Sequence, residues 1–323
     1  MNHTVAAADI GGTHARFALA EVAGGRVASL GRSVTLRTAD HDGLKSAWEE
    51  FGRLAGTDLP RNLAMAFAGP INGTLLKLTN SNWVLKQGLL GEQLGVDRCT
   101  VVNDFGAVAH AVAQLGDEDF EDLCGPKGAL PRTGVTSVIG LGTGLGVAQL
   151  LRTADAYHVI ETEGGHIDFA PRDAADDQIL AFLRPRYSRV SVERIVSGSG
   201  LANLYAAMAA SDGEQLPQCG DEMIWNAAID GSDPLAAAAL ERLLASFGSV
   251  AGDLALAHGS NAVVIAGGLA NRLKERLATS GFASHFVAKG RFRERMESIV
   301  VKLLNHRQPG LYGAAAAFAK EHQ

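Results

Sequence analysis

Several short stretches of this chain combine residue types and spacings that could do chemistry, and the first is DIGGT, residues 9–13. It follows a small apolar run, residues 4–10, that is typical of a buried strand. Glycines let the backbone approach an anion closely, and successive N–H groups in such a turn suit a phosphate. Asp9 could hold a hydrated Mg²⁺ near that phosphate. A tight hairpin in which Asp9 caps its own turn is an equally good interpretation.

A second glycine turn, GLGTGLG at residues 140–146, contains more glycine than a hairpin needs. The Thr143 hydroxyl could reach a phosphate oxygen. The spacing does not meet the dinucleotide pattern G-x-G-x-x-G, and the chain contains no Gly-Lys dipeptide and therefore no Walker A loop. Phosphate binding without either common loop is thus the functional interpretation, and close packing at a glycine-rich turn is the structural one.

Polar residues follow in two later loops. In ETEGGHIDFAP, residues 161–171, Glu163 and His166 flank a Gly-Gly turn and could face one small polar ligand, whereas Glu161 and Asp168 are expected to be solvated. A loop histidine is nonetheless more often bonded to its neighbours than to a ligand. In VERIVSGSGLANLY, Glu193 precedes an apolar pair and a Ser-Gly turn, and a single glutamate of this kind is weak evidence by itself.

The remaining candidate is the polar pair Asn103-Asp104 in VVNDFGAVAHA, where an apolar run gives way to an Ala-rich segment with helical character. A helix N-cap is the simple explanation of Asp104, because aspartate is favoured at that position. A carboxylate at the end of a strand could also accept a proton.

These stretches belong to a chain in which strands alternate with helices. The order strand, Gly/Thr-rich turn, strand occurs twice, in AADIGGTHARFALA and VIGLGTGLGVAQLL, which predicts two similar lobes with a cleft between them as the natural site for chemistry. Apolar spacing predicts helices over 200–209, 223–229 and 234–258, and a strand over 263–266 that ends at Gly267-Gly268. We expect a small lobe over 1–110 with the C-terminal helix, about 309–323, and a large lobe over 111–308.

Composition excludes several classes of protein. The 323 residues are 47% hydrophobic with a net charge of −6, which suits a globular protein and argues against nucleic acid or an anionic membrane as a partner. Cys99, Cys124 and Cys219 form no C-x-x-C pair, so neither a disulfide framework nor a zinc site is expected, and the cytosol fits best. We expect no signal peptide, and the sequence contains neither an H-E-x-x-H motif nor a G-x-S-x-G elbow.

Taken together and in order, DIGGTHARFALA, NDFGAVA, GLGTGLGVA, EGGHIDFAP, ERIVSGSGLANLY and IAGGLANRL resemble the bacterial glucokinase family. That family belongs to the hexokinase, Hsp70 and actin superfamily. The resemblance implies an α/β fold of two ribonuclease-H-like lobes, each a mixed sheet flanked by helices, with an interlobe cleft. It also implies phosphorylation of glucose at the 6-hydroxyl with ATP and Mg²⁺, in a cytoplasmic homodimer without nucleic acid or membrane partners.

The resemblance extends to individual positions. Those that match nucleotide-binding residues are Ala8, Asp9, Ile10, Gly11, Gly12, Thr13, Gly142, Thr143, Gly267 and Gly268, with Asp9 reaching the metal through water. Those that match sugar-binding residues are Asn103, Asp104, Gly144, Glu163, His166 and Glu193. Three positions depart from the family pattern: His14 replaces Asn, Gly106 replaces a common Thr, and Ser199 replaces a common Pro.

Phosphoryl transfer to a hydroxyl requires that the hydroxyl lose its proton, and a carboxylate within hydrogen-bond reach can accept it. Asp104 is our candidate for that base. Three other functions stay open: a sugar-binding regulator of the same fold without turnover, a kinase for another hexose, and an ATP-hydrolysing switch or filament protein. The regulator is disfavoured because the first strand begins within about five residues of Met1, which leaves no helix-turn-helix before it.

Overall fold

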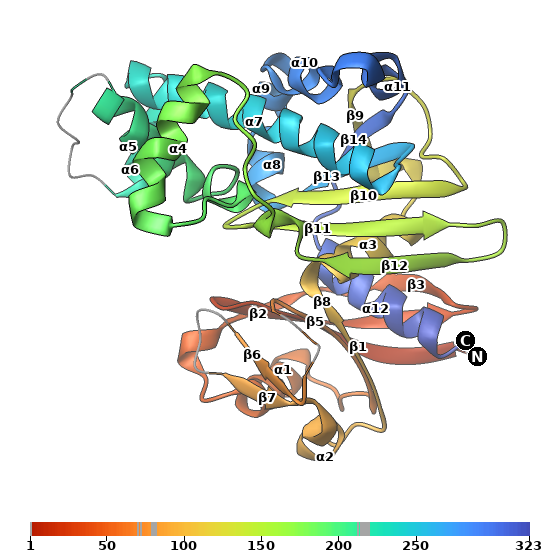
Figure 1. The fold of residues 1–323 in the computed structure, drawn as a ribbon. Coiled ribbons are helices and arrows are strands. Elements are labelled where there is room, and N and C mark those ends of the chain that lie inside the picture. Colours follow the sequence, from red (N-terminus) through yellow and green to blue (C-terminus); the bar gives the residue numbers. More distant parts are fainter. Residues whose placement is uncertain (1, 70, 72, 79–82, 212, 214–219) are drawn as a thin grey trace. The chain divides into compact units, whose positions relative to one another are not determined.

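The computed structural model describes residues 2–69, 71, 73–78, 83–211, 213 and 220–323, and these divide into two compact units (Figure 1). The first unit contains residues 1–116, 159–161 and 306–323. The second contains residues 117–158 and 162–305. Helix α3 (Asp104–Gln114) therefore continues through residue 110, the predicted lobe boundary, and lies wholly in the first unit.

The first unit is built on a six-stranded mixed sheet with the path β3-β2-β1-β5-β8, and β4 pairs with β2. β1 pairs antiparallel with β2, and parallel with β5, which is in turn parallel to β8. Besides α3, its elements are β1 (Asn2–Ile10), β2 (His14–Ala23), β3 (Arg26–Leu30), β4 (Val34–Arg37), α1 (Leu44–Ala55), β5 (Asn62–Phe67), β6 (Leu75–Lys77), β7 (Val84–Lys86), α2 (Leu90–Leu94), β8 (Arg98–Asn103) and α12 (Pro309–Glu321).

Both faces of this sheet are covered, and alternation along β1 explains how. Val5 and Ala7 point to one face, where they pack with α3 and α12 through residues such as Leu311 and Phe318. Ala6, Ala8 and Ile10 point to the opposite face and pack in a cluster with aromatic side chains of α1 and β2. Because small residues line β1, helices can lie close to it; α12 approaches α3 so closely that a Cβ on Gly313 would overlap the backbone of Ala107.

The second unit repeats the five-strand path of the first sheet, with β9 added at one edge in place of β4. Its sheet has the order β12-β11-β10-β13-β14-β9, in which β10, β13 and β14 are parallel while β11 and β9 run antiparallel to their neighbours. Its elements are β9 (Phe120–Cys124), β10 (Gly134–Leu141), β11 (Leu145–Arg152), β12 (Tyr157–Thr162), α4 (Ala174–Tyr187), α5 (Gly200–Ser211), α6 (Asp221–Asp230), α7 (Pro234–His258), β13 (Ala262–Ala266), α8 (Gly268–Arg272), α9 (Lys274–Thr279), α10 (Phe282–Val287), α11 (Arg293–Glu297) and β14 (Val300–Leu304). Of β12, residues 159–161 are counted with the first unit.

The predicted helices over 200–209, 223–229 and 234–258 and the predicted strand over 263–266 are confirmed by α5, α6, α7 and β13. After β13 the chain forms two short helices, α8 and α9, which are separated at Leu273. Cys99 and Cys124 are free thiols, and Cys219 lies outside the described residues.

Helix α7 lies in the core of the second unit, where it packs against α5, α6 and α10 (Figure 1). Among the described residues it alone is long and apolar enough to match a membrane span by length and composition, yet 61% of its most apolar window is buried. Its buried residues include Leu240, Leu244 and Phe247, which contact the helices and strands around it. The apolar character of α7 therefore reflects packing within the unit.

Candidate active site

The predicted residues of the first unit gather at one edge of its sheet. β1, β5 and β8 are parallel, and Ile10 pairs with Phe67, which pairs with Asn103, so all three strands end at the same level. The DIGGT turn follows β1, Ala68-Gly69 follow β5, and Asp104 follows β8. Adjacent strands lie about 4.8 Å apart, which separates the first and last of these groups by roughly 10 Å. Ligands of open α/β sheets bind at such carboxyl ends.

The DIGGT turn is closed by its backbone rather than by Asp9. The Gly11 N–H donates to the His14 carbonyl at 2.9 Å, and the Thr38 hydroxyl donates to the Gly12 carbonyl at 2.7 Å. The Asp9 carboxylate instead accepts from Arg16 at 3.4 Å. The interpretation of Asp9 as a cap of its own turn is therefore wrong.

The Asp9 carboxylate lies in a confined place at the end of β1. Burial raises its pKa above the usual 3.8, although the Arg16 guanidinium acts in the opposite direction. A Cβ on Gly310, near the start of α12, would lie only 2.8 Å from Asp9 Oδ2. Glycine at that position thus leaves room for the carboxylate beside the helix N-terminus, whose partial positive charge favours an anion.

Asn103 and Asp104 differ in their roles from the prediction that Asp104 is the helix N-cap. Asn103 is the N-cap of α3, because its Oδ1 accepts from the N–H groups of Phe105 at 2.9 Å and Gly106 at 3.2 Å. Asp104 is the first helical residue, so its interpretation as the N-cap is wrong. Its Oδ1 accepts from the Phe105 N–H at 2.9 Å, and its side chain is half-buried. Asn103 therefore provides the cap, and the Asp104 carboxylate shares the Phe105 N–H with it.

The burial and the hydrogen bond of Glu161 were not predicted from the sequence. We expected it to be solvated, but it is half-buried within the first unit, and its Oε1 accepts from the Asn103 N–H at 2.8 Å. A Cβ on Gly106 would overlap that same oxygen. The departure of Gly106 from the family pattern therefore has a steric reason. Asp168, by contrast, is exposed and paired with Arg189, as expected of a solvated residue.

In the second unit, Glu193 anchors the other glycine turn. The turn between β10 and β11 is closed by a bond from the Gly142 N–H to the Gly144 carbonyl at 3.0 Å. Glu193 Oε2 accepts from the Leu145 N–H at 2.9 Å, and a Cβ on Gly144 would overlap the Glu193 carboxylate. Glu193 and Gly144, both predicted sugar-binding positions, are thus brought into contact.

The other predicted sugar-binding residues of this unit lie on an adjoining loop. Glu163 and His166 are 65% and 57% exposed, and His166 Nε2 lies 3.9 Å from Glu163 Oε2. A Cβ on Gly165 between them would overlap the carbonyl oxygen of Leu145, so this loop packs directly on the start of β11. Two polar side chains beside the Glu193 turn are therefore open to solvent.

A third loop holds the same turn from behind. The Gly198 N–H donates to the Gly142 carbonyl at 2.8 Å, and the Trp225 indole N–H donates to the Gly198 carbonyl at 2.8 Å. Sequence reasoning missed this role of Trp225, which in the sequence looks like any apolar residue of a predicted helix. Exposed Ser199 follows in this loop, at the position where proline is common in the family.

Gly267 completes the carboxyl edge of the second sheet. It follows β13 with φ = 103°, a conformation that favours glycine, and a Cβ there would overlap the Leu141 carbonyl oxygen. Gly268 begins α8 and has nothing within 4 Å of its Cβ position. Gly140 pairs with Ala266, so the two glycine segments follow neighbouring parallel strands.

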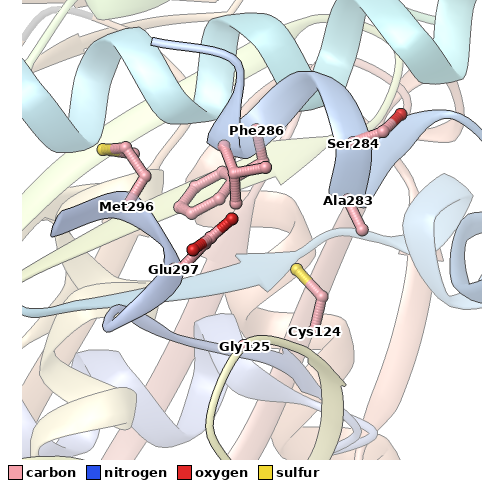
Figure 2. A pocket seen from close by; sticks show the side chains of 8 residues that line it. Cys124, Gly125, Ala283, Ser284, Phe286, Met296 and Glu297 are labelled. Carbon is pink, nitrogen blue, oxygen red and sulfur yellow. The ribbon is translucent and has the colours of Figure 1, made fainter. Parts of the chain in front are cut away.

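Metal-ligating side chains and one cavity elsewhere in the molecule bear on where the site lies. No three His, Cys, Asp or Glu side chains gather as metal ligands in the part of the chain that the structure describes. Figure 2 shows a cavity of about 290 Å³ in the second unit, lined largely by Ala283, Phe286 and Met296 together with Cys124. Burial raises the pKa of Cys124 to about 11, which keeps the thiol neutral near pH 7. This cavity includes none of the predicted site residues, and Ser284 and Glu297 are the polar side chains that line it beside Cys124.

The repeated sheet and its glycine turns define a class: sugar kinases with the actin-like ATPase fold. A solved glucokinase from an Antarctic psychrotroph superposes with a TM-score of 0.84 at 33% identity, covering 97% of this chain and 98% of that one. A Streptomyces griseus glucokinase of the ROK family, solved with glucose and AMPPNP, has a TM-score of 0.62 at 20% identity, covering 97% and 98%.

The sequence comparisons are more specific. The model of the glucokinase family matches residues 6–321. Glucokinase of Zymomonas mobilis subsp. mobilis is 54% identical over 318 residues, which is 98% of both chains. The chain belongs to the glucokinase family and is a sugar kinase that acts on glucose.

Proposed function

We propose that the protein transfers the γ-phosphoryl group of ATP to the 6-hydroxyl of D-glucose, giving glucose 6-phosphate and ADP, with Asp104 as the general base. The observation that carries this proposal is the position of Asp104, which follows the last residue of β8 at the sheet edge that also bears the DIGGT turn. Helix capping is done by Asn103. A half-buried carboxylate at this edge, at the first position of α3, suits proton acceptance from a bound hydroxyl.

For the nucleotide, we propose that backbone N–H groups of both glycine turns bind the phosphates, with Ala8 to Thr13 in one unit and Gly142 and Thr143 in the other. Gly267 and Gly268 would lie by the adenosine. Bound AMPPNP in the Streptomyces griseus protein supports ATP as the donor. Phosphoryl transfer depends mainly on positioning and on neutralising charge, which backbone N–H groups can provide.

Mg²⁺ would be held through water by Asp9. The residues fit this role, since Mg²⁺ usually keeps several waters and takes one or two carboxylates together with phosphate oxygens. Asp9 is a single carboxylate, 22% exposed, in the strand that leads into the proposed phosphate turn. When bound, the metal would neutralise charge on the transferred phosphoryl group. Asp9 would accept hydrogen bonds from the metal's waters, and Arg16 on β2 would hold the Asp9 carboxylate in place.

For the sugar, we propose that Asn103, Glu163, His166 and Glu193 pair with the hydroxyls and that Gly144 contributes a backbone contact. Each hydroxyl that leaves water needs a partner, and a site built for one hydroxyl rejects a sugar that lacks it. Support comes from the exposure of Glu163 and His166 and from the contact between Glu193 and the Gly144 turn.

A coupled assay of ADP release with Mg-ATP tests this function. We expect glucose to stimulate release and phosphorus NMR to place the ester on the 6-oxygen, whereas 6-deoxyglucose should yield no phosphorylated sugar. A panel with mannose, fructose and glucosamine tests the alternative of a kinase for another hexose. Glucose binding without any turnover would instead favour the regulator. The homodimer and the cytoplasmic location stay predictions, and light scattering tests the first.

A further inference from the structure

The N-terminus of α3 contains half of a capping box. In the complete motif, the N-cap side chain accepts the N–H of the third helical residue, and a Glu or Gln at that third position accepts the N-cap N–H in return. Asn103 Oδ1 does accept the Gly106 N–H at 3.2 Å. Gly106 is the third helical residue, however, and has no side chain with which to return the bond.

Glu161 supplies the missing half. Its Oε1 accepts the Asn103 N–H at 2.8 Å, which is the bond that a glutamate at position 106 would make. It also occupies the volume of such a side chain: a Cβ on Gly106 would overlap Oε1 and would lie 2.8 Å from Cγ and 2.9 Å from Cδ of Glu161. Glu161 and Gly106 both belong to the first unit. The two positions are therefore complementary, with one side chain shared between them.

We infer that Glu161 is a positioning residue that completes this capping box from β12 and thereby orients the Asn103-Asp104 backbone, and that position 106 must be glycine for this reason. A carboxylate at a helix N-terminus is also favoured by the helix dipole. The catalytic consequence rests on the proposed function, because it matters only if Asp104 is the base. The capping arrangement itself does not depend on that role.

The arrangement can be tested by moving the glutamate. We compare wild type with Glu161→Gln, Glu161→Ala, Gly106→Glu and the double variant Glu161→Ala/Gly106→Glu, and Asp155→Ala serves as a control for loss of an exposed carboxylate just before β12. Thermal unfolding without substrates reports the cap, and steady-state kinetics report positioning.

Glu161→Ala should lower the thermal midpoint by about 2–4 °C, as for a lost cap. It should lower kcat about ten- to a hundredfold, as for a misplaced reacting group, with little change in the Michaelis constant for glucose. Glu161→Gln should retain both values because its amide oxygen can accept the same N–H. Gly106→Glu should be worse than Glu161→Ala, since two side chains then compete for one volume. The double variant should recover midpoint and kcat above both single variants, because the capping box is then complete within α3.

Additive losses in the double variant, or a Glu161→Ala midpoint like that of the control, would overturn the inference. If the midpoints follow the expected pattern while kcat stays constant throughout, the positioning role is wrong. If wild type does not phosphorylate glucose, the proposed function fails, and the midpoints still decide whether Glu161 completes the cap.

Discussion

The two units of this molecule share one sheet plan but differ in the polar groups at the carboxyl edge. In both, an antiparallel hairpin joined by a glycine turn leads a run of three parallel strands, β1-β5-β8 in the first unit and β10-β13-β14 in the second. The first turn is held at a carbonyl, by the Thr38 hydroxyl on Gly12. The second is held at an N–H, by the Glu193 carboxylate on Leu145.

The same contrast appears at the strand ends. Asp9, the residue before the last of β1, corresponds to Gly140 in β10, so only the first unit has a carboxylate there. β8 is followed directly by Asp104 and a long helix, whereas β14 is followed by Asn305, whose amide donates to the Glu121 side chain at 2.8 Å. The two sheets therefore share a backbone arrangement but not the same reactive groups, because function depends on the side chains at the strand ends.

The largest expected effect concerns Asp104, the residue after β8. Asn305, the residue after β14, provides the control. Asp104→Asn should lower kcat by about a hundredfold or more, since the amide cannot accept the proton, while its oxygen can still accept the Phe105 N–H and preserve the fold. Asn305→Ala should leave kcat near wild type. Steady-state kinetics and a thermal melt of both variants measure this, and turnover above about a tenth of wild type in Asp104→Asn would remove it from the role of base.

The glycines after β13 offer a matched pair. Gly267→Ala should destabilise the protein by about 3 kcal/mol or more, because alanine at φ = 103° is strained and its Cβ would overlap the Leu141 carbonyl. Gly268→Ala has open space at the Cβ position and should be tolerated. Denaturant unfolding compares the two, and equal stabilities would contradict a tight contact between these segments.

Two glutamates of the second unit, Glu163 and Glu193, should separate effects on sugar binding from effects on stability. Glu163→Gln and Glu193→Gln should each raise the Michaelis constant for glucose, because each would lose a charged partner of a sugar hydroxyl. Of the alanine variants, only Glu193→Ala should also lose stability, by about 1 kcal/mol, since it removes the acceptor of the Leu145 N–H.

Steady-state kinetics at varied glucose concentration give the Michaelis constants, and denaturant unfolding curves give the stabilities. Unchanged Michaelis constants in both glutamine variants would exclude them as sugar ligands, and a Glu163→Ala loss equal to that of Glu193→Ala would remove the structural distinction between them.

The smallest effect concerns pH and the carboxylate that only the first unit has. Because the folded-state pKa of Asp9 is raised above 3.8, the folded protein binds more protons than the unfolded chain between the two values, and this group's contribution to stability falls as pH rises through that window. Asp9→Asn should remove this contribution, leave stability near pH 7 equal or slightly higher, and weaken Mg-ATP-dependent turnover. Thermal midpoints from pH 4 to 7 measure it; a steeper loss with rising pH in the variant would contradict the direction of the shift.

Local patterns predicted much of the fold and the candidate residues. Apolar runs ending in glycine predicted both hairpins, and helical spacing predicted α5, α6 and α7, because these elements depend on neighbours in sequence. The division of labour in Asn103-Asp104 was not predictable, since both residue types cap helices well. Nor was the environment of Glu161, because a glutamate two residues before Glu163 carries no local sign that its partner is a backbone N–H 58 residues earlier.

The sequence by itself determined the family, the two glycine turns and the identity of the candidate base, because each is carried by a short run of residues. Only the tertiary structure decided that Asn103 caps α3, that Glu193 accepts a hydrogen bond from the Gly144 turn, and that Glu161 occupies the volume that a side chain at Gly106 would fill. The physical reason is the range of the interactions: turns and periodicity involve residues a few positions apart, whereas a buried carboxylate is satisfied by whichever donor the folded backbone brings to it.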